Sequence, residues 1–542
     1  MMPKQHFSSA RIRMTLLVAL CVIILSPIMM IVMIAAEDTG DLFSHLFDTV
    51  LLRYIINTLL LMAGAGAIAV LFGVSAAWVV CRYQFRGRGV FELLLVLPAA
   101  MPAYLVAYAY TDFLEYSGPV QTTLRAIFGW KTAQDYAFFE IRSLGGAAMM
   151  MGLVLYPYVY LMVRTALRQT SSSFFEVGMM SGKPLFSHVA LPLSRPAIFA
   201  GLAVVLMEVV SDFGTVDYFA VETLTLGIFN AWIGLGSIAS AARIALFACL
   251  IIGLLIFIEL MARSRKSYAN QSASHSGVPV IRASGLQSVM CLTACITPVM
   301  FGFIIPASIL AAHATGFDEG SVYFSLAELI VNSLMLSAIA AIMVMIGGAL
   351  LVVTSRLYYS KPGIMISQSA VIGYAFPGTI LAIGVLGVAG VLDSFFDALS
   401  VDVLLTGSLS MLVFGLMVRF MAVGFGALTT AIEKMPPHMM ESSQLLGKGF
   451  FASLHRVILP QMRTAFLVGA LLVFVDSMKE LPLTLLLRPF SFETFATITY
   501  QYAKDEMIEL AALPALFIII AGIFPVFLAN QALGKKQSVQ PE

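Results

Sequence analysis

Residues 171–197 read SSSFFEVGMMSGKPLFSHVALPLSRPA, and residues 435–464 read MPPHMMESSQLLGKGFFASLHRVILPQMRT. Both stretches lie between long apolar segments, and both carry an acid, a glycine, a basic residue and a Leu-Pro pair in the same order. A short polar loop between membrane helices has no need of such a repeated pattern, so the repetition predicts two copies of one element. The matching residues are Glu176, Gly182, Lys183 and Leu191-Pro192 in the first copy and Glu441, Gly447, Lys448 and Leu459-Pro460 in the second.

Each copy is predicted to form a helix, a break and a second short helix. In the second copy, Pro436 and Pro437 suit a helix start. Gly447 is placed to end that helix by taking a left-handed conformation, and Gly182 is placed to do the same after residues 174–181. A compact helix-Gly-helix element on the membrane surface is a shape that another protein can grip.

The order of residues in these two stretches also resembles a known family motif. A Glu, two small residues, three further residues, a Gly and a later Leu-Pro pair resemble the "EAA" loop of ATP-binding-cassette importer permeases, by which the membrane subunit docks its ATPase. The first copy is shorter, because its Leu-Pro pair follows the Gly more closely than in the second copy. The resemblance implies that the docking residues are Glu176, Gly178, Gly182, Leu191 and Pro192 in the first loop and Glu441, Ser443, Gly447, Leu459 and Pro460 in the second.

The composition places the chain in a membrane. Of 542 residues, 60% are apolar and only 11% are charged, whereas soluble proteins average about 25% charged residues. The net charge of +1, with basic residues spread among loops, argues against a nucleic-acid-binding protein. Five cysteines, an odd number beside or within apolar segments, indicate no disulfide framework.

Apolar segments near the ~20 residues needed to cross a bilayer recur along the whole chain. The first of them is too long for a signal peptide and fits an uncleaved helix. We therefore expect an all-α integral membrane protein with about 12 transmembrane helices. The expected spans are residues 15–36, 56–80, 90–112, 145–167, 197–219, 242–262, 287–312, 331–355, 367–392, 403–427, 465–487 and 509–530.

The chain is predicted to consist of two repeated six-helix halves. Residues 264–285 are polar and Ser-rich, and they read as a linker between a first half, 1–263, and a second half, 286–542. Internal repetition supports this division. Asn57 matches Asn332 and Pro102 matches Pro377 at the same separation of 275 residues, so both matches lie on one register.

Basic and acidic loops alternate between the apolar segments, and this sets the expected orientation. Both repeated loops and the linker are basic, whereas the loops between them hold most of the acids. Both termini and both repeated loops are therefore predicted to be cytoplasmic. The basic loops contain Arg82, Arg86, Arg88, Arg263, Arg265, Lys266, Arg356 and Lys361, and the acidic loops contain Glu37, Asp38, Asp41, Asp48, Asp318, Glu319, Asp393, Asp397 and Asp402.

Acids also lie within the apolar segment that follows each repeated loop. Setting the two Leu-Pro pairs on one another pairs Glu208 with Asp476 and Asp212 with Glu480. A carboxylate at membrane depth is costly, so it usually faces a cavity or a partner. One interpretation is a carboxylate-lined translocation path between the halves. The alternative is structural contacts, with Lys479 or with each other, or a position near the outer surface.

Two further strings narrow the resemblance. Residues 207–219, MEVVSDFGTVDYF, and residues 476–490, DSMKELPLTLLLRPF, resemble the fused two-half permeases of bacterial ferric iron importers. The resemblance implies the type I importer (MetI-like) fold, a location in the bacterial inner membrane, a Fe(III)-binding protein that delivers the cargo, and a separate ATPase acting as a pair. Permeases for thiamine, polyamines, phosphonates and sulfate share the loop and the fold, so these substrates remain open.

The chain is not expected to be an enzyme. A phosphate-binding loop needs Gly, four residues, Gly-Lys and then Ser or Thr. Gly178 precedes Gly182-Lys183 by only three intervening residues, and Pro184 stands where the hydroxyl would be. ATP and Mg²⁺ are thus expected to be used by the partner ATPase, and no metal ligands are assigned in this chain. The main rival is a secondary transporter with twelve helices in two repeats, which would need no repeated cytoplasmic motif.

Overall fold

The computed structural model describes residues 5–264, 277–316, 324–356, 361–436, 439–447 and 449–534. Within these residues the fold is helical, apart from two strands of two residues each, β1 (Tyr83–Gln84) and β2 (Ile281–Arg282), which pair in parallel. Most of the expected linker, residues 265–276, and Lys448 of the second repeated loop lie outside the described residues.

The described chain forms two compact units. Unit 1 contains residues 1–40, 231–246 and 323–497, and unit 2 contains residues 41–230, 247–322 and 498–542. The division falls within α12 (Ile238–Ser264), α23 (Phe495–Lys504) and the π-helix η5 (Asn230–Gly234).

The elements of unit 1 begin with one long helix and continue after residue 323. They are α1 (Gln5–Ala35), α15 (Leu326–Arg356), α16 (Lys361–Ser369), η10 (Ile372–Ala375), α17 (Gly378–Ala398), α18 (Leu409–Glu433), α19 (Met439–Leu445), α20 (Phe450–Ser453), η11 (Leu454–Ile458), α21 (Leu459–Met478) and α22 (Pro482–Leu487).

The elements of unit 2 come from three parts of the chain. They are α2 (Leu42–Leu46), η1 (Phe47–Leu51), α3 (Leu52–Arg82), α4 (Arg88–Leu94), η2 (Leu97–Ala100), α5 (Ala103–Leu114), α6 (Pro119–Phe128), η3 (Ala133–Asp135), α7 (Leu144–Gln169), α8 (Ser172–Met180), η4 (Phe186–Ala190), α9 (Leu191–Ser211), α10 (Gly214–Tyr218), α11 (Leu224–Phe229), α13 (Leu286–Val299), η7 (Met300–Ile304), α14 (Ile305–His313), η8 (Ala314–Gly316) and α24 (Ile508–Gly534).

Ten helical spans of the described chain are long and apolar enough to cross a membrane. An eleventh is a broken pair, Arg88–Ala100 with Ala103–Phe128, bent by 90°. The twelfth expected span, 509–530, lies within α24 (Ile508–Gly534). The all-helical membrane fold is thus confirmed, with ten or eleven full spans among the described residues where the sequence suggested about twelve.

Two of the expected spans are interrupted at a proline. Met101 and Phe376 have extended backbones, and Pro102 and Pro377 follow them as the N-caps of α5 and α17. Proline disfavours helical conformation in the residue before it, which explains both breaks. The expected continuous spans at 90–112 and 367–392 are therefore wrong in this detail, and the two prolines that matched in sequence occupy matching places in structure.

Each unit is built around three closely packed helices: α3, α7 and α9 in unit 2, and α15, α18 and α21 in unit 1. Small residues permit the close approach. A Cβ on Gly73 of α3 would lie 2.7 Å from Val159 Cβ of α7, and one on Gly424 of α18 would lie 2.6 Å from Val344 Cγ1 of α15. Such small-residue contacts are how helices pack in lipid, where no hydrophobic effect drives them together.

The units do not follow chain order. In unit 1, α1 packs against α17, where a Cβ on Gly384 would collide with the backbone of Pro27. In unit 2, α13 contacts α3, and α14 and α24 contact α5. Each unit thus combines a helical core from one half of the sequence with long helices from the other half.

Candidate functional site

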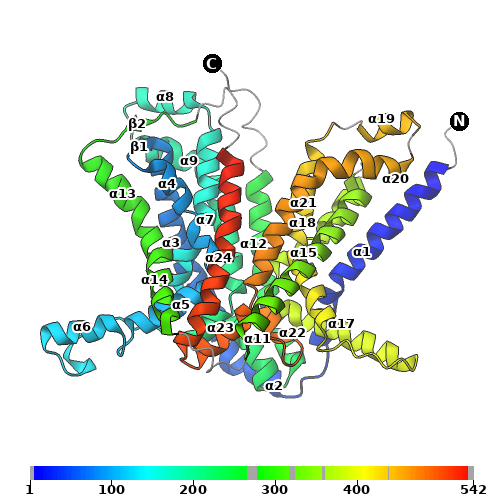
Figure 1. Cartoon of the computed structure of the whole chain (residues 1–542), viewed down its shortest axis with the longest axis horizontal. Coiled ribbons are helices and arrows are strands. Elements are labelled where there is room, and N and C mark those ends of the chain that lie inside the picture. Colours follow the sequence, from blue (N-terminus) through cyan, green and yellow to red (C-terminus); the bar gives the residue numbers. More distant parts are fainter. Residues whose placement is uncertain are drawn as a thin grey trace. The chain divides into compact units, whose positions relative to one another are not determined.

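The first repeated loop forms the expected helix, break and short helix. Ser171 caps α8 by accepting a hydrogen bond from the Ser173 N–H, and α8 ends at Met180. Gly182 then has φ +68°, and Gly447, after α19, has φ +78°. The left-handed glycine expected at the end of each helix is confirmed. In unit 2, α8 lies at one end of the long helices and α6 at the other (Figure 1).

A small residue holds each of these helices against the next one. A Cβ on Gly178 of α8 would lie 2.6 Å from Val189 Cγ2 and 2.8 Å from Leu185 Cδ2. In the second loop the equivalent Ser443 is buried, and its hydroxyl lies 2.8 Å from the Ser453 hydroxyl. The small residues of the motif are therefore packing positions that fix the angle between the two short helices.

The Leu-Pro pair of each loop follows a π-helical turn. η4 ends at Ala190, immediately before Leu191-Pro192, and η11 ends at Ile458, immediately before Leu459-Pro460. Proline lacks an N–H and its ring collides with the carbonyl four residues earlier, so a wider turn accommodates it. The same arrangement precedes Pro306 in α14. The Leu-Pro pair thus marks where the loop joins the long helix.

Both loops present apolar side chains to solvent, in the first loop beside its acid. On α8, Glu176 is exposed together with Val177 and Met180, the latter 89% exposed. On α19, which carries Glu441, the adjoining Leu445 and Leu446 are more than 80% exposed. We call these two surfaces the α8 patch and the α19 patch.

Two of the four membrane acids cap short helices. Asp212 follows α9 and accepts hydrogen bonds from the Thr215 N–H, at 2.9 Å, and the Thr215 hydroxyl, at 3.1 Å, at the start of α10. Glu480 follows α21 and accepts one from the Leu483 N–H, at 3.1 Å, at the start of α22. The two acids that the sequence alignment paired therefore have the same structural role: each stabilises the turn at which the chain reverses direction after a long helix.

The remaining acids have different surroundings. Asp476 pairs with Lys479 at 2.8 Å, as the structural alternative suggested. Glu480 also pairs with Arg419 of α18 at 3.1 Å, and its side chain is only 6% exposed. Glu208 lies on α9, half-buried. The four residues are not gathered into one cluster within either unit, and the translocation path they were assigned to remains a prediction.

The structure reveals a repeated clamp that sequence reasoning did not assign. In unit 2, the Asn57 side chain donates to the Glu222 carbonyl at 3.0 Å, and the Thr58 hydroxyl accepts from the Leu224 N–H at 3.0 Å. Thr223 then caps α11. The sequence showed the match of Asn57 with Asn332. The Glu-Thr pair that each asparagine contacts is also repeated in the sequence, at residues 222–223 and 493–494, but the clamp was not predicted from it.

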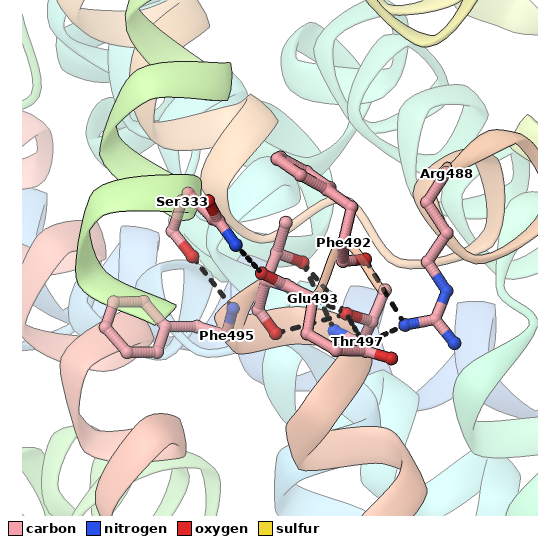
Figure 2. Close-up of polar contacts among 8 residues, drawn as sticks. Ser333, Arg488, Phe492, Glu493, Phe495 and Thr497 are labelled. Carbon is pink, nitrogen blue, oxygen red and sulfur yellow. Dashed lines mark hydrogen bonds and ion pairs between the residues drawn. The ribbon is translucent and has the colours of Figure 1, made fainter. Parts of the chain in front are cut away.

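Figure 2 shows the second copy of this clamp, in unit 1. Asn332 donates to the Glu493 carbonyl at 3.2 Å, and the Ser333 hydroxyl accepts from the Phe495 N–H at 2.8 Å. The Glu493 carboxylate is buried, pairs with Arg488 and accepts from the Thr497 hydroxyl at 2.7 Å. The clamp thus ties the start of α23 to the core helix α15.

Removing the hydroxyl of either clamp should destabilise the protein measurably. Ser333→Ala is expected to cost about 1–3 kcal/mol, because the buried Phe495 N–H would lose its acceptor. Thr58→Ala should cost a similar amount through the Leu224 N–H. Unfolding of the purified protein measures both. Ser394→Ala is the control, since this exposed hydroxyl bonds only its own helix at Gly390; equal stability of all three variants would contradict the clamp.

A cavity of about 530 Å³ lies in the segment between α5 and α7 of unit 2. Its lining includes Glu115, Gln121, Tyr136 and Arg142. The segment is ordered by its own contacts, among them the Thr132 and Asp135 capping box. Hydrogen bonds from the Thr132 and Lys131 N–H groups hold the pKa of Asp135 below its ordinary value.

Comparisons with known proteins agree with this geometry. Residues 69–267 match the family "Binding-protein-dependent transport system inner membrane component". The chain is 23% identical to the Fe(3+)-transport system permease protein FbpB 2 of Haemophilus influenzae, over 88% of this chain and 89% of that protein. It is 23% identical to the ferric transport system permease protein FbpB of Actinobacillus pleuropneumoniae, over 79% of this chain and 63% of that protein. It is 26% identical to the sulfate transport system permease protein CysT of Salmonella typhimurium, over 38% of this chain and 73% of that protein.

The helical spans and the family match together indicate the class. The chain matches the inner membrane permeases of binding-protein-dependent transport systems over residues 69–267, and it is similar to a transport permease over 88% of its length. It is the multi-pass membrane subunit of such an ATP-driven importer and not its ATPase, and its family implies an ATPase and a solute-binding protein as partners.

Proposed function

We propose that this permease imports ferric iron across the bacterial inner membrane. The observation that carries the proposal is the extent of similarity. Two relatives named as ferric permeases match over 88% and 79% of the chain and so cover both of its halves, whereas the shorter sulfate relative covers only 38% of it.

The α8 and α19 patches would each receive one copy of the ATPase. Each patch lies on a short helix that packs on the π-helical turn leading into a long helix: α8 packs on η4, before α9, and α19 packs on η11, before α21. Because a helix in lipid keeps its internal hydrogen bonds, a push on the short helix is passed along the long one. ATP and Mg²⁺ belong to the ATPase pair in this scheme, and both patches and both termini face the cytoplasm.

The opposite end of each unit would face the binding protein. There the caps at Asp212 and Glu480 reverse the chain, and the clamps at Asn57 and Asn332 hold the next helices. The delivered cargo is Fe(III), brought by a Fe(III)-binding protein. Movement of α9 or α21 therefore reaches this end through two rigid, hydrogen-bonded reversals.

Transport by the reconstituted complex tests the proposal. The chain is co-purified with its partner ATPase, placed in proteoliposomes, and supplied with a solute-binding protein loaded with radioactive iron. ATP-dependent uptake of Fe(III) is expected, with hydrolysis stimulated by the iron-loaded binding protein. Uptake of sulfate, molybdate, thiamine or a polyamine without iron uptake would overturn iron as the cargo and leave the permease class unchanged.

A further inference from the structure

Unit 2 contains a buried tyrosine, Tyr108, whose hydroxyl makes no hydrogen bond to the residues that the structure describes. Tyr108 lies on α5 and is 1% exposed. An unpaired buried hydroxyl costs about 1–3 kcal/mol. The centroid of the Tyr108 ring lies 5.6 Å from that of Tyr104 and 4.5 Å from that of Tyr218. Tyr108 is also close enough to Tyr500 and Asp212 to interact electrostatically with them.

A carboxylate, Asp217, and a lysine, Lys504, lie beside these tyrosines. Tyr500 of α23 donates to Asp217 of α10 at 2.5 Å, and Lys504 contacts Asp217 at 3.0 Å and the Tyr500 oxygen at 3.1 Å. The Asp217 side chain is 10% exposed, whereas that of Lys504 is 51% exposed. The buried charge is therefore neutralised by a long cation that can swing outward into solvent. We call Tyr104, Tyr108, Asp212, Asp217, Tyr218, Tyr500 and Lys504 the tyrosine cluster.

The fold itself does not require the cluster, because the same scaffold is built in the other half of the sequence without it. Matching helix starts, namely Pro102 with Pro377, Asp212 with Glu480 and Thr223 with Thr494, define the equivalent positions. Five of the seven cluster residues then have apolar counterparts, whereas Asp212 is matched by Glu480 and Tyr104 by Thr379. The pairs are Tyr104 with Thr379, Tyr108 with Ile383, Asp217 with Leu485, Tyr218 with Leu486, Tyr500 with Phe229 and Lys504 with Ile233.

We propose that the tyrosine cluster is a transient binding site for Fe(III), in which Tyr108, Tyr500 and Asp217 supply the oxygen ligands. This inference rests on the proposed function. Phenol and carboxylate oxygens are hard donors and suit a small, highly charged cation. Lys504 holds the place of that cation while the site is empty and leaves Asp217 when iron arrives.

The exchange needs no oxidant or reductant. Each phenol that binds iron loses its proton to water, and each new iron–oxygen bond replaces a bond from iron to the ligand with which it was delivered. Iron stays Fe(III), and Lys504 keeps its proton as it moves into solvent. Because Tyr108 and Tyr500 are buried, iron can enter only when α10 or α23 moves, which couples binding to the transport cycle.

Phenylalanine substitutions provide a sharp test, since they keep the ring and remove only the oxygen. The complex with its ATPase, in nanodiscs, is titrated with Fe(III) nitrilotriacetate, and the visible phenolate-to-iron charge-transfer band is recorded. Tyr108→Phe, Tyr500→Phe and Asp217→Asn should each weaken iron binding about tenfold or more, a loss of about 1.4 kcal/mol, and lower ATP-dependent iron uptake.

The controls match the variants in chemistry and burial. Tyr156→Phe removes another fully buried hydroxyl that has no partner in the described part of the chain, but whose neighbours are Tyr160 and Cys295 instead of an acid. Asp505→Asn removes an exposed charge next to Lys504. Both controls should retain the band and the uptake.

The outcomes separate this inference from the proposed function. If the wild-type complex imports iron while Tyr108→Phe and Tyr500→Phe keep the band and the uptake, the cluster is not the iron site and the function stands. If the wild-type complex imports a polyamine and no iron, both ideas fall. Phenylalanine would be tolerated in that case, because ring faces and carboxylates, without phenol oxygens, hold ammonium groups.

Discussion

Arg488→Ala is expected to be among the most destabilising single substitutions in unit 1. Arg488 pairs with Glu493, whose side chain is 7% exposed and which also bonds Thr497. Removing one partner of a buried ion pair leaves the other charge uncompensated, which costs about 3–5 kcal/mol. Unfolding of the purified protein in mixed detergent measures this cost, and a reduced yield of folded protein in the membrane should accompany it.

The other unit contains a matched pair for comparison. Glu222 occupies the place of Glu493 in the first clamp and pairs with Arg53, but there the side chains are 55% and 41% exposed for Arg53 and Glu222. A solvent-exposed pair contributes only about 0–1 kcal/mol. Arg53→Ala should therefore have little effect. If both arginine variants unfold alike, burial of Glu493 does not control the stability of the clamp.

The short elements were predictable because their signals are local. Gly182 and Gly447 end their helices with positive φ, as the glycines after helical stretches predicted. Pro102 and Pro377 matched in sequence, and each starts a helix after an extended residue. The breaks themselves were missed, because counting apolar residues does not register a proline that interrupts a span.

The acids show where a local signal was present but ambiguous. Asp212 is followed three residues later by Thr215, which is the spacing of a helix cap, and Glu480 precedes Pro482 at a helix start. A cap and a cavity-facing charge look alike in an apolar sequence. The Arg419 contact of Glu480 joins positions on different helices, so no spacing rule could have revealed it.

Which helices pack together in each unit could not be predicted from the sequence, for a different reason. The packing of α1 on α17 depends on glycines such as Gly384 and Gly387 meeting Pro27 and Met30 across long chain separations. Hydropathy gives the number and length of helices and says nothing of which faces meet. The tyrosine cluster was missed likewise, because Tyr108 and Tyr500 lie in separate apolar segments and only packing brings them near Asp217.

Gly178→Leu is expected to abolish most ATP-coupled transport while the protein still inserts and folds. A Cβ at this position would already lie 2.6 Å from Val189, so a leucine must push α8 away from η4 and tilt the α8 patch. Overpacking of this kind costs about 1–3 kcal/mol. If this free energy destabilises the position of α8 that binds the ATPase, the fraction of molecules able to bind the ATPase drops about 5–150-fold.

Two measurements separate a docking defect from general damage: ATP-dependent uptake in proteoliposomes, and the amount of ATPase that co-purifies with the permease. Gly390→Leu is the matched control, because a Cβ on that helical glycine of α17 meets open space. It should keep both activities. Because Gly178 is packed inside the membrane subunit, its variant acts on the ATPase only through the position of α8; a Gly178→Leu protein that binds ATPase and transports normally would mean that the α8 patch is not where the ATPase docks.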